Sequence, residues 1–166
     1  MREHSGAEGK NNNRNPTLRE AEREKGVSGE AIHVDAGDYA FVDIDGEGTR
    51  RGDTYYPNRG LTRAEVGYTY KGDLEGTSTM VYLIAYKADA APVVGLERFE
   101  GSLDGHDGSF VMRHVGEQDA GAVRDRLEVV PGLGTGGLTG LRGEADLVIE
   151  GHAEDGYELV LHYDLD

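Results

Sequence analysis

A pair of opposite charges interrupts one of the apolar strands that the sequence predicts. Within Val93–Gly101, Glu97 and Arg98 are adjacent, so they project from opposite faces of an extended chain. One of them must face the interior, where a charge is stable only beside a partner. Buried charges with partners often mark functional sites, although a polar plug in a filled barrel or an external ion pair would give the same pattern.

A histidine lies on another predicted apolar face. Phe110, Met112 and His114 are spaced by two and share one side of a strand. A single histidine at such a position is either a hydrogen-bonded core residue or an acid–base group. Tyr82 would add a hydroxyl donor from a further strand. We therefore predict Glu97, His114 and Tyr82 as catalytic residues.

The remaining predicted site residues form a mostly apolar lining. Tyr82 and Tyr86 are spaced by four, so they share a face with the residues between them at even spacing. Both tyrosines would line a pocket with apolar bodies and hydroxyl tips, or would simply fill the core. The residues predicted to bind substrate are Tyr86, Glu65, Met80, Phe99, Phe110 and Met112.

The glycine-rich stretch PGLGTGGLTGLRGE, Pro131–Glu144, contains the spacing G-x-G-x-x-G at Gly132, Gly134 and Gly137. A dinucleotide-binding turn needs a helix that opens at the third glycine. Further glycines occupy the positions of that helix, and each disfavours it by about 1 kcal/mol relative to alanine. We interpret the stretch as a bend between strands.

No cofactor or metal is predicted. The acidic run Asp43–Gly48 resembles the first half of a calcium-binding loop, but Thr54 stands where a bidentate glutamate is required. We interpret it as an acidic turn and leave weak calcium binding open. The six histidines show no metal-binding spacing, and there is no cysteine for disulfides, thiolate nucleophiles or metal ligation.

The charge balance restricts the partners. The chain has 166 residues, with 32 acidic against 17 basic side chains and a net charge of −15. Such a field repels nucleic acid and anionic lipid, so neither is expected as a partner. There is no secretory signal pattern and no apolar run long enough to span a bilayer. We expect a cytoplasmic protein and leave a homodimer open.

The elements that must position these residues are strands. From residue 31 onward polar and apolar residues alternate, as in Tyr157–Leu165, and glycine-rich breaks separate the segments. The other segments are 31–36, 38–44, 64–70, 74–86, 93–103, 109–115, 122–130 and 145–150. The pattern predicts roughly eight or nine antiparallel strands in a barrel or a sandwich. We favour an all-β, eight-stranded antiparallel β-barrel of lipocalin-like type, because closure removes exposed edges.

Residues 1–30 differ from this domain, which we place at residues 31–166. They contain few large aliphatic side chains, so they are expected to form a flexible extension. Thr17–Glu20 has the spacing of a capping box and predicts a short helix over residues 17–25. Alone, this helix would be marginally stable, and it is expected to act as a lid if it docks on the barrel.

Several blocks of the chain resemble a bacterial family of small domains of unknown function. They are Gly72–Ser78, Gly95–Gly101, Gly108–Val111 and Val129–Gly136, with Leu138–Glu144. The resemblance covers about residues 60 to 166 and implies a barrel like that of allene oxide cyclase. Barrels of this type are also similar to [4+2] spiro-cyclases of polyketide pathways, one kind of which has an N-terminal segment that closes the barrel mouth.

Three hypotheses for function follow. The first is a cofactor-independent cyclase that folds an apolar, polyketide-like substrate into a reactive conformation for an intramolecular [4+2], Diels–Alder type cyclisation. The second is a non-catalytic barrel that binds a hydrophobic small molecule. The third is a structural barrel with a filled core, which has no room for any ligand.

Overall fold

The computed structural model describes residues 27–32, 39–51, 54–119, 122–150 and 157–165. In these ranges the chain is all-β, as predicted, with a single 3-10 turn, η1 (Gly136–Leu138). The predicted helix over residues 17–25, and with it the lid, lies outside the described residues. Within the described part of the chain, no helix is long and apolar enough to cross a membrane.

Twelve strands are present in the described ranges, and all their pairings are antiparallel. They are β1 (Val27–Ile32), β2 (Tyr39–Asp43), β3 (Gly48–Arg51), β4 (Thr54–Pro57), β5 (Gly60–Lys71), β6 (Leu74–Tyr86), β7 (Ala91–Leu103), β8 (His106–Asp119), β9 (Ala122–Val129), β10 (Arg142–Glu150), β11 (Tyr157–Leu159) and β12 (His162–Asp164). The sheet therefore already includes residues from Val27 onward, ahead of the boundary expected at residue 31.

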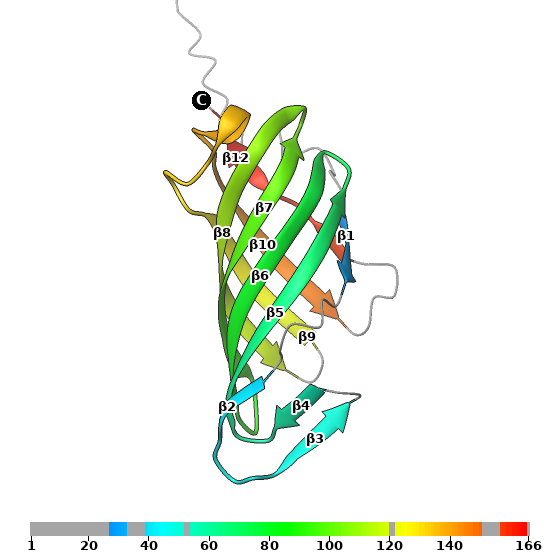
Figure 1. The fold of residues 1–166 in the computed structure, drawn as a ribbon, viewed down its shortest axis with the longest axis vertical. Helices are drawn as coiled ribbons and strands as arrows, with labels where there is room; N and C mark the ends of the chain where they lie inside the picture. The colour runs from blue at the N-terminus through cyan, green and yellow to red at the C-terminus, as the bar shows by residue number, and fades with distance from the viewer. Residues whose placement is uncertain (1–26, 33–38, 52–53, 120–121, 151–156, 166) are drawn as a thin grey trace, which may run out of the picture.

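Ten of these strands form one sheet in the order β11-β1-β5-β6-β7-β8-β9-β10-β12, with β2 also paired to β5. Strands β5 to β8 are long neighbours joined by short turns (Figure 1). A separate hairpin, β3–β4, lies at one end of the molecule and was not predicted. Its residues include the arginine pair Arg50–Arg51 and show little alternation.

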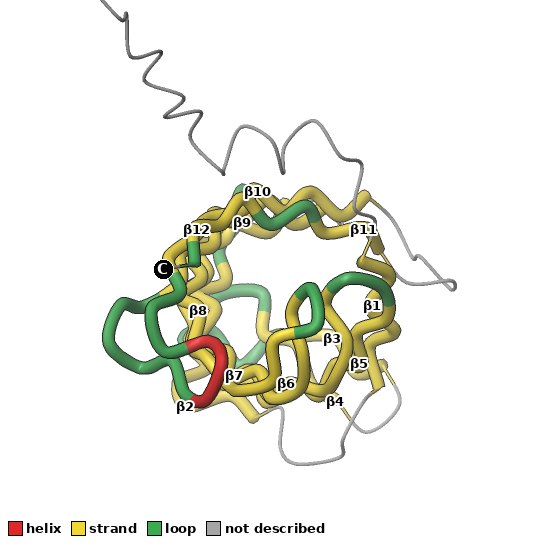
Figure 2. The backbone as a smooth tube through the Cα atoms, turned by 90° about the horizontal axis from the view of Figure 1, so that it is seen from above, coloured by secondary structure: helices red, strands yellow, loops and turns green. Residues whose placement is uncertain are grey.

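The predicted closed barrel of eight strands is not confirmed, because the sheet is open. The C-terminal segment predicted as one strand is divided at Val160–Leu161. Its first part, β11, pairs with β1, and its second part, β12, pairs with β10, so no single strand joins both ends of the sheet. The sheet still curls strongly, and β9 to β11 stand across from β5 to β7 (Figure 2).

The inner face of the curl carries the core. Its centre is aromatic: the ring centroids of Tyr70 and Phe99 lie 5.8 Å apart, and those of Phe99 and Phe110 lie 5.0 Å apart. Phe99 and Phe110 are fully buried. A second, smaller apolar cluster is formed by Ile84, Ala91 and Val93. Both clusters fill the inside of the curl, and the candidate site lies where they approach each other.

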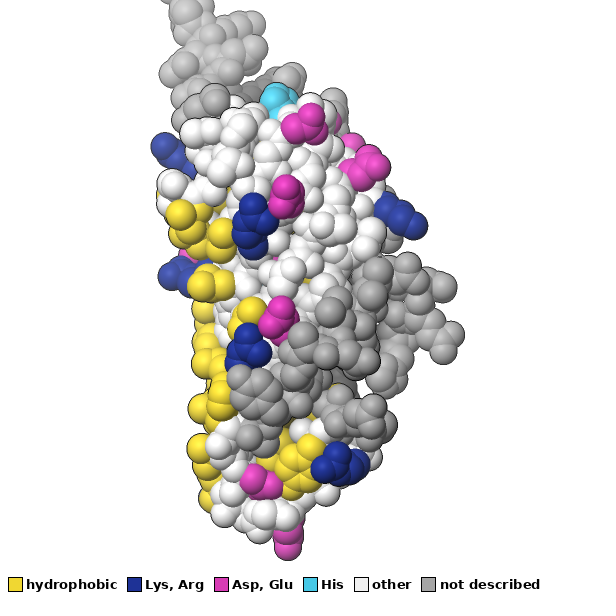
Figure 3. Space-filling view, viewed as in Figure 1, with side chains coloured by type: hydrophobic (Ala, Val, Ile, Leu, Met, Phe, Trp, Pro, Cys, Tyr) yellow, Lys and Arg dark blue, Asp and Glu magenta, His cyan; other side chains and the backbone are white. Residues whose placement is uncertain are grey.

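The outer face of β6 to β8 is also apolar. Val81 lies opposite Leu96, and Leu83 and Val115 flank Val94 on either side. Each of the five side chains is at least 37% exposed. Hydrophobic side chains gather along one edge of the molecule in Figure 3. These strands are therefore apolar on both faces, which weakens the alternation in their sequence.

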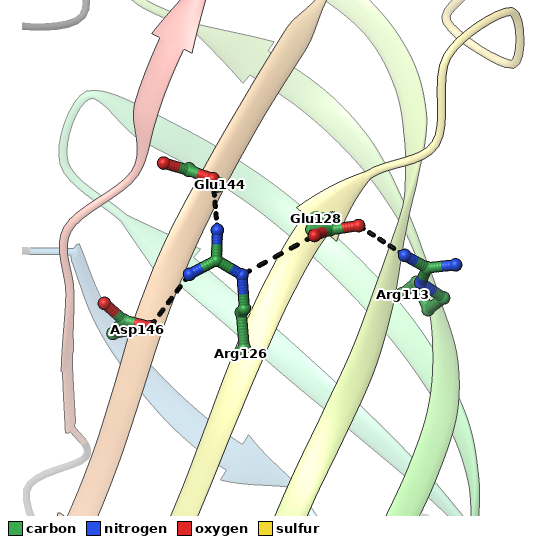
Figure 4. A network of polar contacts seen from close by, with 5 residues as sticks. All are labelled: Arg113, Arg126, Glu128, Glu144 and Asp146. Atoms are coloured by element: carbon green, nitrogen blue, oxygen red, sulfur yellow. Dashed lines mark hydrogen bonds and ion pairs between the residues drawn. The ribbon is translucent and has the colours of Figure 1, made fainter.

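The outer face of β8 to β10 carries charges instead. Arg126 lies 2.6 Å from Glu144 and 3.5 Å from Glu128, and Glu128 also pairs with Arg113 (Figure 4). Arg126 also lies 4.0 Å from Asp146 on β10. These side chains come from three neighbouring strands, so the network ties those strands together from the outside.

The two loops that resemble ligand-binding motifs are turns. In the glycine-rich stretch, η1 packs against β8, where the backbone N–H of Thr135 donates to the carbonyl of Ser109 at 2.9 Å. Gly136 has a φ of +58°, which suits a residue without a side chain. In the acidic run, Asp43 accepts from the N–H of Gly46 at 3.0 Å and from the hydroxyl of Tyr55 at 2.5 Å.

Candidate functional site

The inward-facing charge of the predicted pair is Glu97 on β7. Glu97 is fully buried, whereas Arg98 is exposed and pairs with Glu100. The Tyr70 hydroxyl on β5 donates to Glu97 Oε1 at 2.6 Å, and the Ser78 hydroxyl on β6 donates to the same oxygen. Hydrogen bonds of this kind compensate a carboxylate for the loss of water.

His114 on β8 lies between two carboxylates. Its Nε2 is 2.7 Å from Glu97 Oε2, and its Nδ1 is 3.5 Å from Asp125 Oδ2 on β9. The first distance is that of a hydrogen bond, and the second is that of an ion pair. The His114 side chain is 3% exposed. The three residues therefore form a buried row, Glu97–His114–Asp125, across strands β7, β8 and β9.

This arrangement keeps the imidazole charged. Burial alone lowers the pKa of His114, but Asp125 and Glu97 together raise it to about 9. His114 is then an imidazolium at neutral pH, and it lies between the carboxyl groups of Glu97 and Asp125. A histidine in this state can donate protons but does not act as a base.

One carboxylate oxygen of Asp125, Oδ1, is buried and has no hydrogen-bond partner among the described residues, and the residue is only 7% exposed. A buried acceptor without a partner is costly, and such exceptions call for an explanation. Asp125 lines a cavity, and its Oδ1 lies close to Gly116 of β8, where an added Cβ would be 2.2 Å away.

The cavity has a volume of about 140 Å³. Polar groups lie at one part of its wall, with His114, Asp125 and Gln118 close together in the β8–β9 register. The rest of the wall is aromatic or aliphatic. Its lining residues are Tyr68, Met80, Tyr82, Ile84, Val93, His114, Gln118, Val123, Asp125, Leu147 and Ile149.

Two glycines make room beside this row. Gly116 lies opposite Asp125, and a Cβ there would lie 2.2 Å from Asp125 Oδ1 and 2.1 Å from a backbone oxygen of β9. Gly95 lies opposite both His114 and Tyr82 on the neighbouring strands, and a Cβ there would lie 2.7 Å from the Cβ of Tyr82. Any larger residue at either position would displace the polar row or the cavity wall.

The structure brings three of the nine predicted site residues to the cavity wall: His114 and Tyr82 from the catalytic set, and Met80 from the lining. Glu97 lies behind His114 and contacts the cavity only through it. Phe99, Phe110 and Met112 belong to the packed core, and Tyr86 packs against the smaller apolar cluster. Glu65 lies on the other face of β5 and pairs with Arg63 at 3.3 Å, so it is not part of this wall.

Sequence reasoning missed Asp125 and Gln118. Asp125 alternates with Val123, Leu127 and Val129 in a predicted strand, so a charge on an apolar face was visible in the sequence. It is the same signal that identified Glu97. Gln118 had no such signal, because the apolar pattern of β8 weakens after Val115.

The comparisons with known proteins agree with this fold. A family model described as a protein of unknown function (DUF3224) matches residues 36–161. The crystal structure of a DUF3224 protein of unknown function from Shewanella oneidensis MR-1 is similar, with a TM-score of 0.59 and 26% identity over 86% of this chain and 94% of that chain. No curated protein matches the chain. The chain belongs to the DUF3224 family.

Proposed function

We propose that the protein binds a small, largely apolar molecule in the cavity lined by β5 to β10, with His114 and Asp125 at its polar end. The observation that carries the proposal is Asp125, a residue of a mostly apolar cavity wall whose buried Oδ1 has no hydrogen-bond partner within the described ranges. Ligand sites commonly combine an apolar wall with a few converging polar groups and a perturbed pKa.

The size of the cavity limits the ligand. An apolar protein cavity of about 150 Å³ holds a benzene-sized molecule, and drug-sized ligands occupy about 300–1,000 Å³. At about 140 Å³, the cavity suits a molecule with one ring or a short branched chain. Binding of such a molecule is therefore favoured over binding of a whole polyketide chain.

Filling the cavity tests this proposal. Val123→Phe adds an aromatic ring at the wall, and Val148→Phe makes the same change on the exposed outer face of neighbouring β10. With benzyl alcohol as the probe in isothermal titration calorimetry, wild type and Val148→Phe should bind, and Val123→Phe should not. Equal binding by both variants, or no binding by wild type, would overturn the proposal.

A cyclase is the second candidate, and a specific observation favours it. The cavity wall carries the charged imidazole of His114, the carboxylate of Asp125 and the aromatic residue Tyr82, which together could hold and polarise a reacting molecule. The resemblance to allene oxide cyclase and to [4+2] cyclase barrels supports the same candidate. A polyketide-like substrate would need more room than the cavity offers, so this candidate ranks second.

Cyclisation is an isomerisation, so substrate and product share one mass and differ in chromatographic retention. If the protein is a cyclase, the small molecule that co-purifies with wild type should differ in retention, at equal mass, from the one that co-purifies with Asp125→Asn. If both proteins carry the same compound, binding without turnover is the better account. Native mass spectrometry would identify the bound mass in each case.

A further inference from the structure

We propose that the ligand of this cavity carries a hydrogen-bond donor, best of all a protonated amine, which binds Asp125 Oδ1. This inference rests on the proposed function, because it requires the cavity to hold a ligand. It goes beyond that function by assigning the chemistry of the polar end of the ligand and by excluding a carboxylate there.

The hydrogen bonds of the buried row leave only one acceptor for a ligand. Glu97 Oε1 accepts from Tyr70 and Ser78, and Glu97 Oε2 accepts from His114. Nε2 of His114 therefore has a hydrogen-bond partner, whereas Nδ1 has none among the described residues and lies 3.5 Å from Asp125 Oδ2. The acceptor that remains without a partner among the described residues of this row is Asp125 Oδ1.

The charge of the row points to a cation. Two acidic side chains flank one basic side chain in the row, so the acidic groups outnumber the basic one. Apart from His114, none of the described residues that line the cavity is basic. A ligand carboxylate beside Asp125 would meet a like charge, whereas an ammonium group would form an ion pair with it. Hydrogen bonds between charged groups are about twice as strong as neutral ones.

The test uses four probes that share one ring and differ in one group: toluene, benzyl alcohol, benzylamine and benzoate. Calorimetric titration of the full-length protein near neutral pH should give the tightest binding for benzylamine, then benzyl alcohol, then toluene. Benzylamine should bind about tenfold or more tightly than toluene, which is what one charge-assisted hydrogen bond supplies. Benzoate should not bind.

Asp125→Asn is the matched variant, because it keeps the shape of the side chain and removes its charge. It should reduce the preference for benzylamine over toluene, since the amide oxygen that replaces Oδ1 accepts from the ammonium group without a negative charge of its own. The order of affinities in wild type is a separate readout that holds even if this variant does not fold.

The outcomes separate this inference from the proposed function. If toluene binds as tightly as benzylamine, or benzoate binds best, the cavity is a ligand site but the assignment of a donor is wrong. If none of the four probes binds, both the inference and the proposed function fail. If Asp125→Asn folds and keeps the full preference for benzylamine, the amine is bound by another residue and the inference is overturned.

Discussion

The charged state of His114 predicts how stability changes with pH. An unperturbed histidine has a pKa of about 6.5, and in the folded protein the pKa of His114 is raised to about 9. Because the folded pKa lies above the unfolded one, the stabilisation is complete below about pH 6.5 and is lost as the pH rises to about 9. The ion pairs of His114 with Glu97 and Asp125 are its physical source.

The magnitude follows from the difference between the two pKa values. A difference of about 2.5 units, at about 1.36 kcal/mol each, corresponds to about 3 kcal/mol. The free energy of unfolding should therefore fall by about 1.4 kcal/mol per pH unit between pH 6.5 and 9. Urea denaturation followed by circular dichroism, repeated across this range, measures the slope.

His114→Gln is the control, because glutamine does not titrate in this range. Its free energy of unfolding should be lower than that of wild type near neutral pH and nearly independent of pH up to about 9. A flat profile for wild type would refute the reasoning, and so would an equal slope in the variant. If the variant does not fold, the ring signals of His114 in wild type give its pKa directly by NMR. A pKa below about 7 would also refute the reasoning.

Three further predictions concern the surroundings of this row. Glu97→Gln should lower the pKa of His114 by about one unit or more, because it removes a carboxylate in contact with the imidazolium; an unchanged NMR titration would contradict this. Gly116→Ala should lower the free energy of unfolding, measured by urea denaturation, by about 1–3 kcal/mol, because its Cβ would lie 2.2 Å from Asp125 Oδ1. An unchanged free energy of unfolding would contradict this, because it would mean that the strand shifts to accommodate the methyl group. Arg126→Ala should cost less than about 1 kcal/mol, because its network is exposed; a larger loss would mean that the outer charges hold the sheet together.

The long strands were predictable because their residues alternate and their turns are marked. The predicted strand over residues 74–86 is confirmed to its ends as β6. The glycine-rich break predicted over Asp104–Gly108 is shorter in the structure, because β8 already begins at His106. Its first two residues, Asp104 and Gly105, have positive φ, at +50° and +83°, which a tight hairpin between β7 and β8 requires. Local sequence determines such turns, so they can be read without knowledge of the rest of the chain.

Closure could not be predicted in the same way. The residues Tyr157–Leu165 alternate throughout, yet the strand is divided at Val160–Leu161 and its two parts pair with opposite ends of the sheet. This division depends on how far the sheet curls, which is a property of all its strands together. Alternation specifies the faces of a strand and leaves its partner open.

The candidate site was only partly predictable for a related reason. A charge on an apolar face is a local signal, and it identified Glu97 and His114, both of which are buried. The same signal was present at Asp125 but was not used. Packing across the sheet decides whether a buried residue lines the cavity or fills the core. Spacing in the sequence therefore does not distinguish Met80, which lines the cavity, from the core residues Phe99, Phe110 and Met112.

The central claim is that the cavity beside His114 and Asp125 holds a small molecule. Its most direct test is a two-dimensional ¹H–¹⁵N NMR titration of the full-length protein with benzyl alcohol. We predict saturable shifts at the amides of β6, β8 and β9 that surround Tyr82, His114 and Asp125. Shifts confined to the exposed apolar face of Val94, Leu96 and Val115, or no saturable shift at all, would contradict the account.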